Sequence, residues 1–390
     1  MPTVSEDVYI MGAWDHPTRN AVDRSLPQLY ADICENVLAD AGLTRADVDG
    51  LFLGNDAPGT GPLSIRDYLN LTNVTHFDTS HTSGSSYTVH VGHAVDAIRA
   101  GRCKVALLMQ ASRTRQNVGK GPLGRLDVPD QPDFQWEHPM GTAILTNYGM
   151  VAMRHMHEFG TTSEQLAWIK VAASHHASRN PHALYPKIVT VADVVNAPVV
   201  AEPFHKLDCC IISDGGGGLL VVREDIARSL KRPLVRIRGQ GLGLWGQNGG
   251  DFDLTRTGAV QSGAMAYAEA GVTPADIQYA SLYDSFTITV LLQLEDLGFC
   301  AKGEGGRFVE DGKLIAGRGP LPVNTDGGGL CNNHPGNRGG MVKVIEAVKQ
   351  LRGEANAGTQ VPDCSLALAN AIGGQLGVRH ASATIILERV

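Results

Sequence analysis

The sequence lacks the features that mark several large classes of protein. None of its apolar runs reaches the ~18 residues that a membrane-spanning helix needs. Basic residues (33) are fewer than acidic ones (40), the formal net charge is −7, and Lys and Arg form no block. Aromatic residues make up only 6% of the chain, which leaves few rings on which bases could stack. Membrane insertion and nucleic-acid binding are therefore both disfavoured.

Cysteine is also sparse and unpatterned. Seven cysteines are scattered without Cys-x-x-Cys spacing, and residues 1–15 contain three carboxylates and no apolar signal core. We therefore expect reduced thiols and a cytoplasmic protein. Four histidines sit close together in pairs, but their helical setting and the lack of nearby cysteine lead us to predict no metal site. They are His155, His157, His175 and His176.

What the sequence does contain is an internal repeat. Residues 38–53 (LADAGLTRADVDGLFL) and 267–282 (YAEAGVTPADIQYASL) both predict the end of an amphipathic helix, an Ala-Gly pair, a Thr-x-x-Asp turn and an apolar strand. A second echo follows in the same order, because residues 93–101 and 345–353 each end a helix that feeds an apolar strand. Two echoes in one order indicate two similar halves.

Helices alternate with short β-rich apolar runs in both halves, which indicates βαβ units and mostly parallel sheets covered on both faces. We therefore predict an N-terminal half at 1–225 and a C-terminal half at 226–390. Residues from about 112 to 200 have no counterpart in the second half, and we expect them to form an insertion over the site. The apolar runs read as strands are 105–109, 218–222, 366–369 and 383–388.

An ordered set of motifs carries a resemblance to a known family. His81-Thr-Ser-Gly leads into a helix, residues 203–216 end in Ser-Asp-Gly-Gly, and residues 282–287 read Leu-Tyr-Asp-Ser-Phe-Thr. A glycine run at 327–329 precedes Asn-His-Pro at 333–335. In this order the motifs resemble the thiolase superfamily over nearly the whole chain, and its sterol-carrier-protein thiolase branch most of all. The resemblance implies an α/β thiolase fold, in which two similar βαβ-rich halves pack as an α-β-α-β-α layered sandwich.

Two departures from the thiolase pattern bear on the chemistry. By the Cys-x-Ser-Gly match, the nucleophilic cysteine of thiolases is His81 here, and the second thiolase cysteine, in a Cys-x-Gly motif, is Ala371. Neither residue can form an acyl thioester, so acyl transfer through a cysteine is disfavoured. Cys103 and Cys364 lie at or before strands and are expected in the core. Cys331, close to the Asn-His-Pro motif, is the one thiol that remains of interest.

The same motif matches imply which residues polarise the substrate. Tyr283 stands where thiolases carry Asn and the sterol-carrier branch carries His, and His334 keeps the histidine of the Gly-His-Pro motif. His81, at the start of a helix, is a possible further donor. Asp284 can equally be a buried carboxylate that holds a loop through backbone N–H groups. The predicted catalytic residues are Tyr283, His334 and His81, and the predicted substrate or oxyanion residues are Asp284, Asn324, Gly373 and Gly374.

A polarised thioester without a covalent nucleophile suits retro-aldol cleavage of a β-hydroxyacyl-CoA. We assign Tyr283 to the β-hydroxyl, and His334 to the enolate oxygen or to proton transfer at Cα. The pattern resembles the thiolase-like aldolases of bacterial steroid side-chain degradation, some of which carry a second Tyr where this chain has His334. That resemblance implies cleavage of a steroidal 17-hydroxyacyl-CoA to a 17-keto steroid and a short acyl-CoA. CoA is then part of the substrate, and no other cofactor is expected.

Two other functions stay open from the sequence. An acyltransferase or condensing enzyme with direct, non-covalent transfer would be favoured if Cys331 pointed into the pocket. A catalytically silent, acyl-CoA-binding subunit is suggested by the loss of both cysteines. The family resemblance also implies a symmetric homodimer, paired through a strand within 105–111. It further implies a partner protein with an OB fold and a zinc ribbon, which together with the dimer would form a heterotetramer.

Overall fold

The computed structural model describes residues 7–54, 60–117, 137, 143–229, 231–246, 252–336 and 339–390. The earlier strands of its main sheet are β1 (Val8–Asp15), β2 (Gly50–Leu53), β3 (His76–Asp78), β4 (Val105–Ser112) and β7 (Gly215–Arg223). The later ones are β8 (Val235–Trp245), β9 (Tyr279–Leu282), β10 (Leu366–Gln375) and β11 (Arg379–Arg389). Within the described residues these strands form one sheet, in the order β3-β2-β4-β7-β1-β8-β11-β10-β9. The earlier and later groups meet where β1 pairs with β8.

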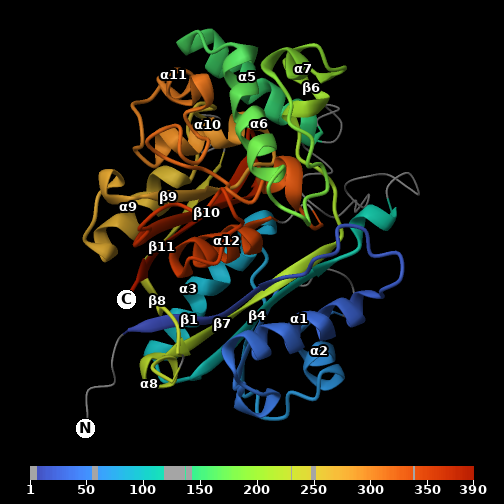
Figure 1. Ribbon diagram of the computed structural model, residues 1–390, viewed down its shortest axis with the longest axis vertical. Coiled ribbons are helices and arrows are strands. Elements are labelled where there is room, and N and C mark those ends of the chain that lie inside the picture. The colour runs from blue at the N-terminus through green and yellow to red at the C-terminus, as the bar shows by residue number, and fades with distance from the viewer. Residues whose placement is uncertain are drawn as a thin grey trace.

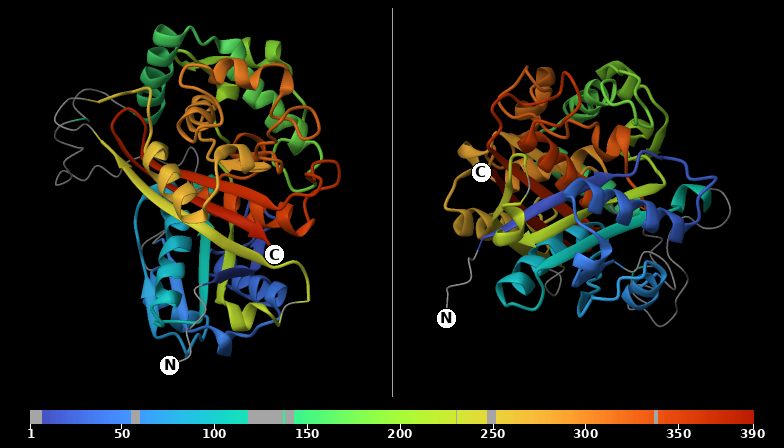
Figure 2. Two further views of the ribbon diagram at one scale, coloured as in Figure 1. Left: turned by 90° about the vertical axis from the view of Figure 1, so that its left-hand side faces the viewer. Right: turned by 60° about the horizontal axis from the view of Figure 1, so that its bottom comes forward.

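Helices divide this sheet into layers (Figure 1). The principal helices are α1 (Leu26–Ala41), α2 (Pro62–Tyr68), α3 (Ser86–Arg99), α9 (Ala259–Ala270), α10 (Thr287–Asp296) and α12 (Gly340–Arg352). Helix α12 contacts β9 and β10 as well as β1 and β7, and α3 contacts both β4 and β11. Helix α1 covers the outer face of the earlier strands, and α9 covers the outer face of β8 and β11 (Figure 2). The predicted α-β-α-β-α sandwich is confirmed.

Three apolar cores separate these layers. The central core joins side chains of α3, such as Val91 and Val95, to side chains of α12, such as Val344 and Val348. Strands from both groups contribute to it, so the two central helices bury apolar surface on both sides. None of the described helices is both long enough and apolar enough to cross a membrane.

The sequence repeat forms the same local structure twice. In each copy a helix (α1 or α9) is followed by a 3₁₀ turn and a strand (β2 or β9). The Thr44 N–H and hydroxyl donate to Asp47 Oδ2 at 2.8 and 2.7 Å. Thr273 donates to Asp276 Oδ2 in the same way, again at 2.8 and 2.7 Å. The Thr-x-x-Asp motif is therefore a capping box that starts the turn at both places.

The prediction of mostly parallel sheets is wrong. Of the eight strand pairs that the described residues form in the main sheet, three are parallel, namely β2–β3, β2–β4 and β9–β10. The long strands pair antiparallel, and β10 runs directly into β11 through a tight turn between Gln375 and Arg379. A strand buried on both faces reads as a continuous apolar run whatever the direction of its neighbours, so the sequence did not reveal this.

The strand predicted to pair two protomers is also not at an edge. Residues 105–111 belong to β4, which is buried throughout and pairs with β2 on one side and β7 on the other. The edge on that side of the sheet is β3, where Phe77 is 54% exposed. The family resemblance therefore led to the wrong strand, because β4 is paired on both of its edges in this fold. Edge strands are typically short and carry polar residues.

The segment predicted as an insertion covers the later half of the sheet. Residues 118–136 and 138–142 of it lie outside the described residues. The remainder forms α5 (Ile144–Phe159), α6 (Ser163–Ala177), α7 (Val191–Val195) and a small hairpin, β5 (Val199–Ala201) with β6 (Phe204–His205). Helix α6 packs on α10, and both views place this segment beside the later helices (Figures 1 and 2).

Candidate active site

Tyr283 and His334 meet between the layers. Tyr283 directly follows β9, and His334 follows a π-helical turn, η9 (Gly328–Asn332). The Tyr283 hydroxyl lies 3.1 Å from His334 Nε2, and the two rings meet edge to face with centroids 5.4 Å apart. Both side chains are buried, Tyr283 at 4% and His334 at 1% exposure. The two residues that the motifs singled out are thus brought into direct contact.

The protonation state of this pair follows from its burial. Desolvation raises the pKa of Tyr283 well above its ordinary value, and the neighbouring Tyr148, Cys210 and Asp284 raise it further. Tyr283 is therefore a neutral phenol near pH 7, and its hydroxyl lies within hydrogen-bonding distance of His334 Nε2. A phenol in this arrangement can take a proton from a substrate hydroxyl while it passes its own proton to the imidazole.

Two amide side chains hold the backbone that leads to Tyr283. Gln293 of α10 accepts from the Tyr283 N–H at 3.1 Å and donates to the Tyr283 carbonyl at 2.6 Å. Asn324 does the same for the preceding residue, since it accepts from the Leu282 N–H at 2.8 Å and donates to the Leu282 carbonyl at 2.9 Å. Asn324 thus holds the backbone of the residue immediately before Tyr283. The motif matches missed Gln293, although a polar residue inside the apolar run of α10 was its signal.

The Asp284 carboxylate binds the loop that carries His334. It accepts from the backbone N–H groups of Gly329 at 2.9 Å and Leu330 at 3.2 Å, and it forms an ion pair with Lys343 of α12. These contacts hold η9 against the end of β9. Lys343 was not anticipated from the sequence, because its partner lies on a distant segment.

The His334 loop is also tied to the earlier half of the chain. Ser213 accepts from the His334 N–H at 2.9 Å and donates to Asn333 Oδ1 at 2.7 Å. The Asn333 amide donates to Asp15 Oδ1 at 2.9 Å, and Asp15 is in turn paired with the buried Arg19 at 2.7 Å. The Tyr283–His334 pair therefore sits where the two groups of strands are joined by buried polar contacts.

The turn that replaces the thiolase nucleophile lies against Tyr283. His81 itself is exposed, whereas Gly84 is buried and so close that a Cβ there would lie 2.3 Å from the Tyr283 hydroxyl. Gly373 of β10 faces the same turn, since its Cβ would lie 1.7 Å from the Thr82 carbonyl oxygen. Gly374 is exposed, with φ at +100°. The structure thus brings the turn and Gly373 to the site and leaves the His81 side chain accessible to solvent.

We expect Gly84→Ala to disable the site. Its methyl group would collide with the Tyr283 hydroxyl and, at 2.5 Å, with the Ile372 carbonyl oxygen, which cannot move away because it belongs to β10. Overpacking of this kind costs about 1–3 kcal/mol of stability. Displacement of Tyr283 should lower kcat by about 10²-fold. The matched control is Gly61→Ala, because nothing lies within 4 Å of a Cβ at Gly61. Equal kcat values for the two variants would contradict the placement of Tyr283.

The thiols near the site are protonated and poorly suited to nucleophilic attack. Burial raises the pKa of Cys331, which is 1% exposed, and burial likewise raises the pKa of Cys210. Cys103 and Cys364 lie in the central core, as predicted. Because the thiolate is the reactive form, neither Cys331 nor Cys210 takes over the role of the missing cysteines at neutral pH.

Two of the histidines weighed as metal ligands, His155 and His176, have other partners. His155 lies 3.1 Å from Glu295 Oε2 and 2.8 Å from the Thr161 hydroxyl, and all three are buried. His176 accepts from the Ala316 N–H at 2.9 Å through Nε2. Among the residues that the structure describes, no group of three or more His, Cys, Asp or Glu side chains is placed to hold a metal ion.

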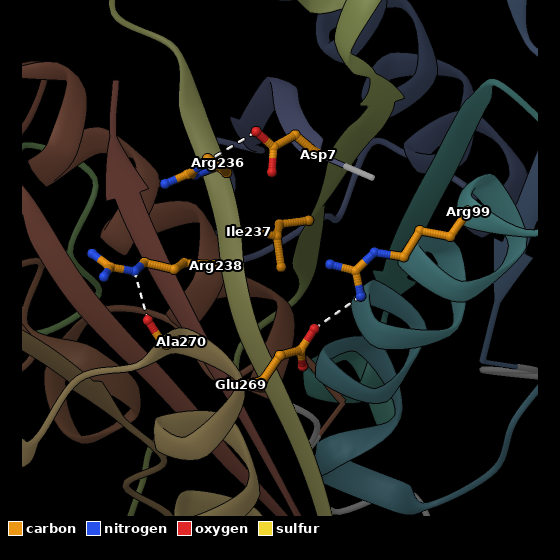
Figure 3. A pocket seen from close by; sticks show the side chains of 7 residues that line it. All are labelled: Asp7, Arg99, Arg236, Ile237, Arg238, Glu269 and Ala270. Carbon is orange, nitrogen blue, oxygen red and sulfur yellow. Dashed lines mark hydrogen bonds and ion pairs between the residues drawn. The ribbon is translucent and has the colours of Figure 1, made fainter. Parts of the chain in front are cut away.

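A surface hollow elsewhere on the molecule shares no residue with this site (Figure 3). It is lined by Asp7, Arg99, Arg236, Ile237, Arg238, Glu269 and Ala270. Its arginines are paired, Arg99 with Glu269 at 2.8 Å and Arg236 with Asp7 at 3.1 Å, and Arg238 donates to a backbone carbonyl. The hollow is therefore a seam of ion pairs between α3, α9 and β8, and its charges are not available to bind an anion.

Two α/β halves around a shared pair of central helices, with the site between them, define the class of thiolase folds. Residues 247–389 match the family described as thiolase C-terminal domain-like. An acetyl-CoA acetyltransferase of Methanothermobacter thermautotrophicus is 32% identical over 386 residues, which cover 95% of this chain and 97% of that protein. The chain belongs to the thiolase superfamily.

Other similar proteins are named as lyases and aldolases. A 17-hydroxy-3-oxo-4-pregnene-20-carboxyl-CoA lyase of Mycobacterium tuberculosis is 34% identical over 373 residues, or 88% of this chain and 94% of that protein. The solved structure of an Ltp2-ChsH2(DUF35) aldolase superposes with a TM-score of 0.88 at 32% identity, covering 99% of this chain and 98% of that chain. The resemblance to steroid side-chain-degrading aldolases, drawn from the motifs, is thereby confirmed.

Proposed function

We propose that this protein is a carbon–carbon lyase that cleaves a β-hydroxyacyl-CoA by a retro-aldol reaction. The observation that carries the proposal is the buried Tyr283–His334 hydrogen bond at 3.1 Å, next to a site from which both thiolase cysteines are missing. The likeness to a pregnene-carboxyl-CoA lyase supports a steroidal 17-hydroxyacyl-CoA as the substrate. The products would be a 17-keto steroid and a short acyl-CoA.

The proposed reaction balances without any added reagent. The Tyr283 hydroxyl takes the proton of the β-hydroxyl group as it gives its own proton to His334 Nε2. The Cα–Cβ bond breaks, Cβ becomes the carbonyl carbon of the ketone, and the electron pair passes to the thioester as an enolate. The imidazolium of His334 then returns a proton to Cα. CoA is part of the substrate, and the proton balance needs no further cofactor.

The enolate oxygen also needs a hydrogen-bond donor in this mechanism. Our candidates are the segment at Gly373 and Gly374 and the exposed His81. Asp284 is a less suitable neighbour for that oxygen, because it is a carboxylate whose lone pairs already accept from Gly329 and Leu330. We propose that Asp284 and Asn324 act by placing Tyr283 and His334.

The direct test uses the purified protein with and without a candidate OB-fold partner. A steroidal 17-hydroxyacyl-CoA is supplied, and the 17-keto steroid and the short acyl-CoA are quantified by liquid chromatography with mass spectrometry. We expect release of both products in equal amounts. If neither product forms when the partner is present, this substrate class is wrong, and other β-hydroxyacyl-CoAs come next.

An acyltransferase is the second candidate, because the acetyl-CoA acetyltransferase relative matches nearly the whole chain. Direct, non-covalent transfer would be favoured by a thiol in the pocket, and a covalent route would require one, so Cys331 is the residue to test. We expect Cys331→Ser to keep cleavage within about twofold of wild type, since burial holds this thiol protonated. Transfer of a labelled acyl group to the wild-type enzyme, lost in Cys331→Ser, would instead favour the transferase.

We also propose a homodimer that binds a partner with an OB fold and a zinc ribbon, to give a heterotetramer in the cytoplasm. The DUF35 component named in the similar aldolase structure supports a protein partner. The open edge at β3 is our candidate for pairing between protomers, in place of residues 105–111. Light scattering coupled to size-exclusion chromatography, with each protein alone and with both together, measures these masses.

A further inference from the structure

Lys343 is a fully buried ammonium on the central helix α12. It is 1% exposed, and its ion-pair partner, Asp284, is 0% exposed. Taking two charges out of water is costly, and a well-packed apolar pair at such a place is often as stable or more stable. Stability alone therefore gives little reason to keep this pair, which directs attention to what the two residues touch.

The Lys343 ammonium is connected, through Asp284, to the segments that carry both Tyr283 and His334. Asp284 directly follows Tyr283 in the chain, and its carboxylate accepts from the N–H groups of Gly329 and Leu330 in η9. Gly329 lies between the side chains of Asp284 and His334. A Cβ at this position would lie 2.9 Å from Asp284 Oδ1 and 2.9 Å from His334 Cδ2. Any shift of Asp284 would therefore move the Tyr283 and His334 segments relative to each other.

We propose that Lys343 is a positioning residue for the lyase reaction. Paired with Asp284, it holds the Tyr283 and His334 segments at hydrogen-bonding distance and cancels the negative charge that Asp284 places beside the phenol. This inference rests on the proposed function. It assigns to Lys343 a role that acts through Asp284, without contact with the substrate.

The charge effect has a definite sign. The groups that face Tyr283 are Tyr148 of α5, Cys210 and Asp284, which disfavour loss of its proton, and the Gly339 N–H, which favours it. His334 also faces Tyr283, with its Nε2 atom 3.1 Å from the phenol oxygen. Asp284 also faces Cys331, which lies beside Lys170 of α6. Without Lys343 the Asp284 carboxylate is uncompensated, so it stabilises the protonated forms around it. The acidic limb of the pH–rate profile should then move to higher pH.

The test is a double-mutant cycle in the full-length protein with its partner. In Lys343→Met we expect kcat to fall by about 10²-fold, with KM changed much less. We also expect the acidic limb of the pH–rate profile to move to higher pH. In Lys343→Met with Asp284→Asn no buried charge is left unpaired, so we expect at least about tenfold recovery of kcat and a return of the limb. The control is Lys349→Met on the same helix, which should match the wild type.

Two results would overturn the proposal. One is a wild-type kcat and pH profile in Lys343→Met. The other is an equal loss of kcat in the single and double variants with an unmoved pH profile, which would mark a packing role alone. If Lys343→Met does not fold, the neutral double variant is compared with the single variant Asp284→Asn. The double variant must then have the higher kcat and a pH–rate profile closer to that of the wild type.

A failure of the proposed function is distinguishable from a failure of this inference. If the wild type cleaves no tested substrate, ¹³C-labelled tyrosine reports on Tyr283 directly by NMR. The Tyr283 signal, assigned with Tyr283→Phe, should shift in Lys343→Met and return toward its original place in the double variant. An unmoved signal in Lys343→Met would refute the positioning role whatever the reaction proves to be.

Discussion

Tyr283→Phe should abolish cleavage and leave the protein folded. The change removes a single oxygen atom, so the ring keeps its place in the core, but the relay from the substrate hydroxyl to His334 Nε2 is cut. General acid–base catalysis of this kind contributes about 10²–10⁴-fold. We therefore expect kcat to fall by about 10³-fold or more, measured as product release under saturating substrate, with an unchanged circular dichroism spectrum.

The matched control is Tyr279→Phe. Tyr279 is the first residue of β9, the strand that Tyr283 directly follows, and it is also buried. Its hydroxyl lies near Ser281 and Thr325 and away from the Tyr283–His334 pair. We expect this variant to keep its kcat. Full activity in Tyr283→Phe would point to another base, and would return the silent-subunit and transferase functions to consideration.

His334→Ala should produce a loss of similar size. The substitution removes the acceptor of the Tyr283 proton and the group proposed to protonate Cα, so we expect kcat to fall by about 10²–10⁴-fold. Added imidazole should restore part of the activity, because it can occupy the space left by the ring. Rescue separates a lost proton acceptor from a collapsed loop.

His334→Tyr refines this prediction. Some of the resembling aldolases carry a Tyr at this place, and a phenol there can still exchange a proton with Tyr283. We therefore expect this variant to retain more activity than His334→Ala. If imidazole fails to rescue His334→Ala and His334→Tyr is no better, the His334 side chain serves only to hold the loop.

The motifs in the sequence were enough to single out two residues that the fold brings into contact. Tyr283 and His334 are 51 residues apart in the chain, and they were matched only because each belongs to a short motif in a fixed order. The loss of both thiolase cysteines was equally plain at His81 and Ala371. The repeated Thr-x-x-Asp turns gave the two similar halves, since a capping box is a local structure that local sequence specifies.

The protonation of Tyr283 and its support came only from the folded chain. Burial places the pKa of Tyr283 far above its ordinary value, which favours a role in a proton relay over a role as a deprotonated base. Gln293 contacts Tyr283, and Lys343 contacts the neighbouring Asp284; the sequence did not reveal these partners, because the segments meet only after folding.

By itself, then, the sequence determined the family, the repeat and the loss of the thiolase cysteines, and it predicted the pair that takes their place, because these depend on residue type and short-range order. The tertiary structure decided the strand directions, the true sheet edge at β3 and the charge environment of the site. Those properties depend on which distant segments exclude water from one another, and burial of that kind is set by the whole fold.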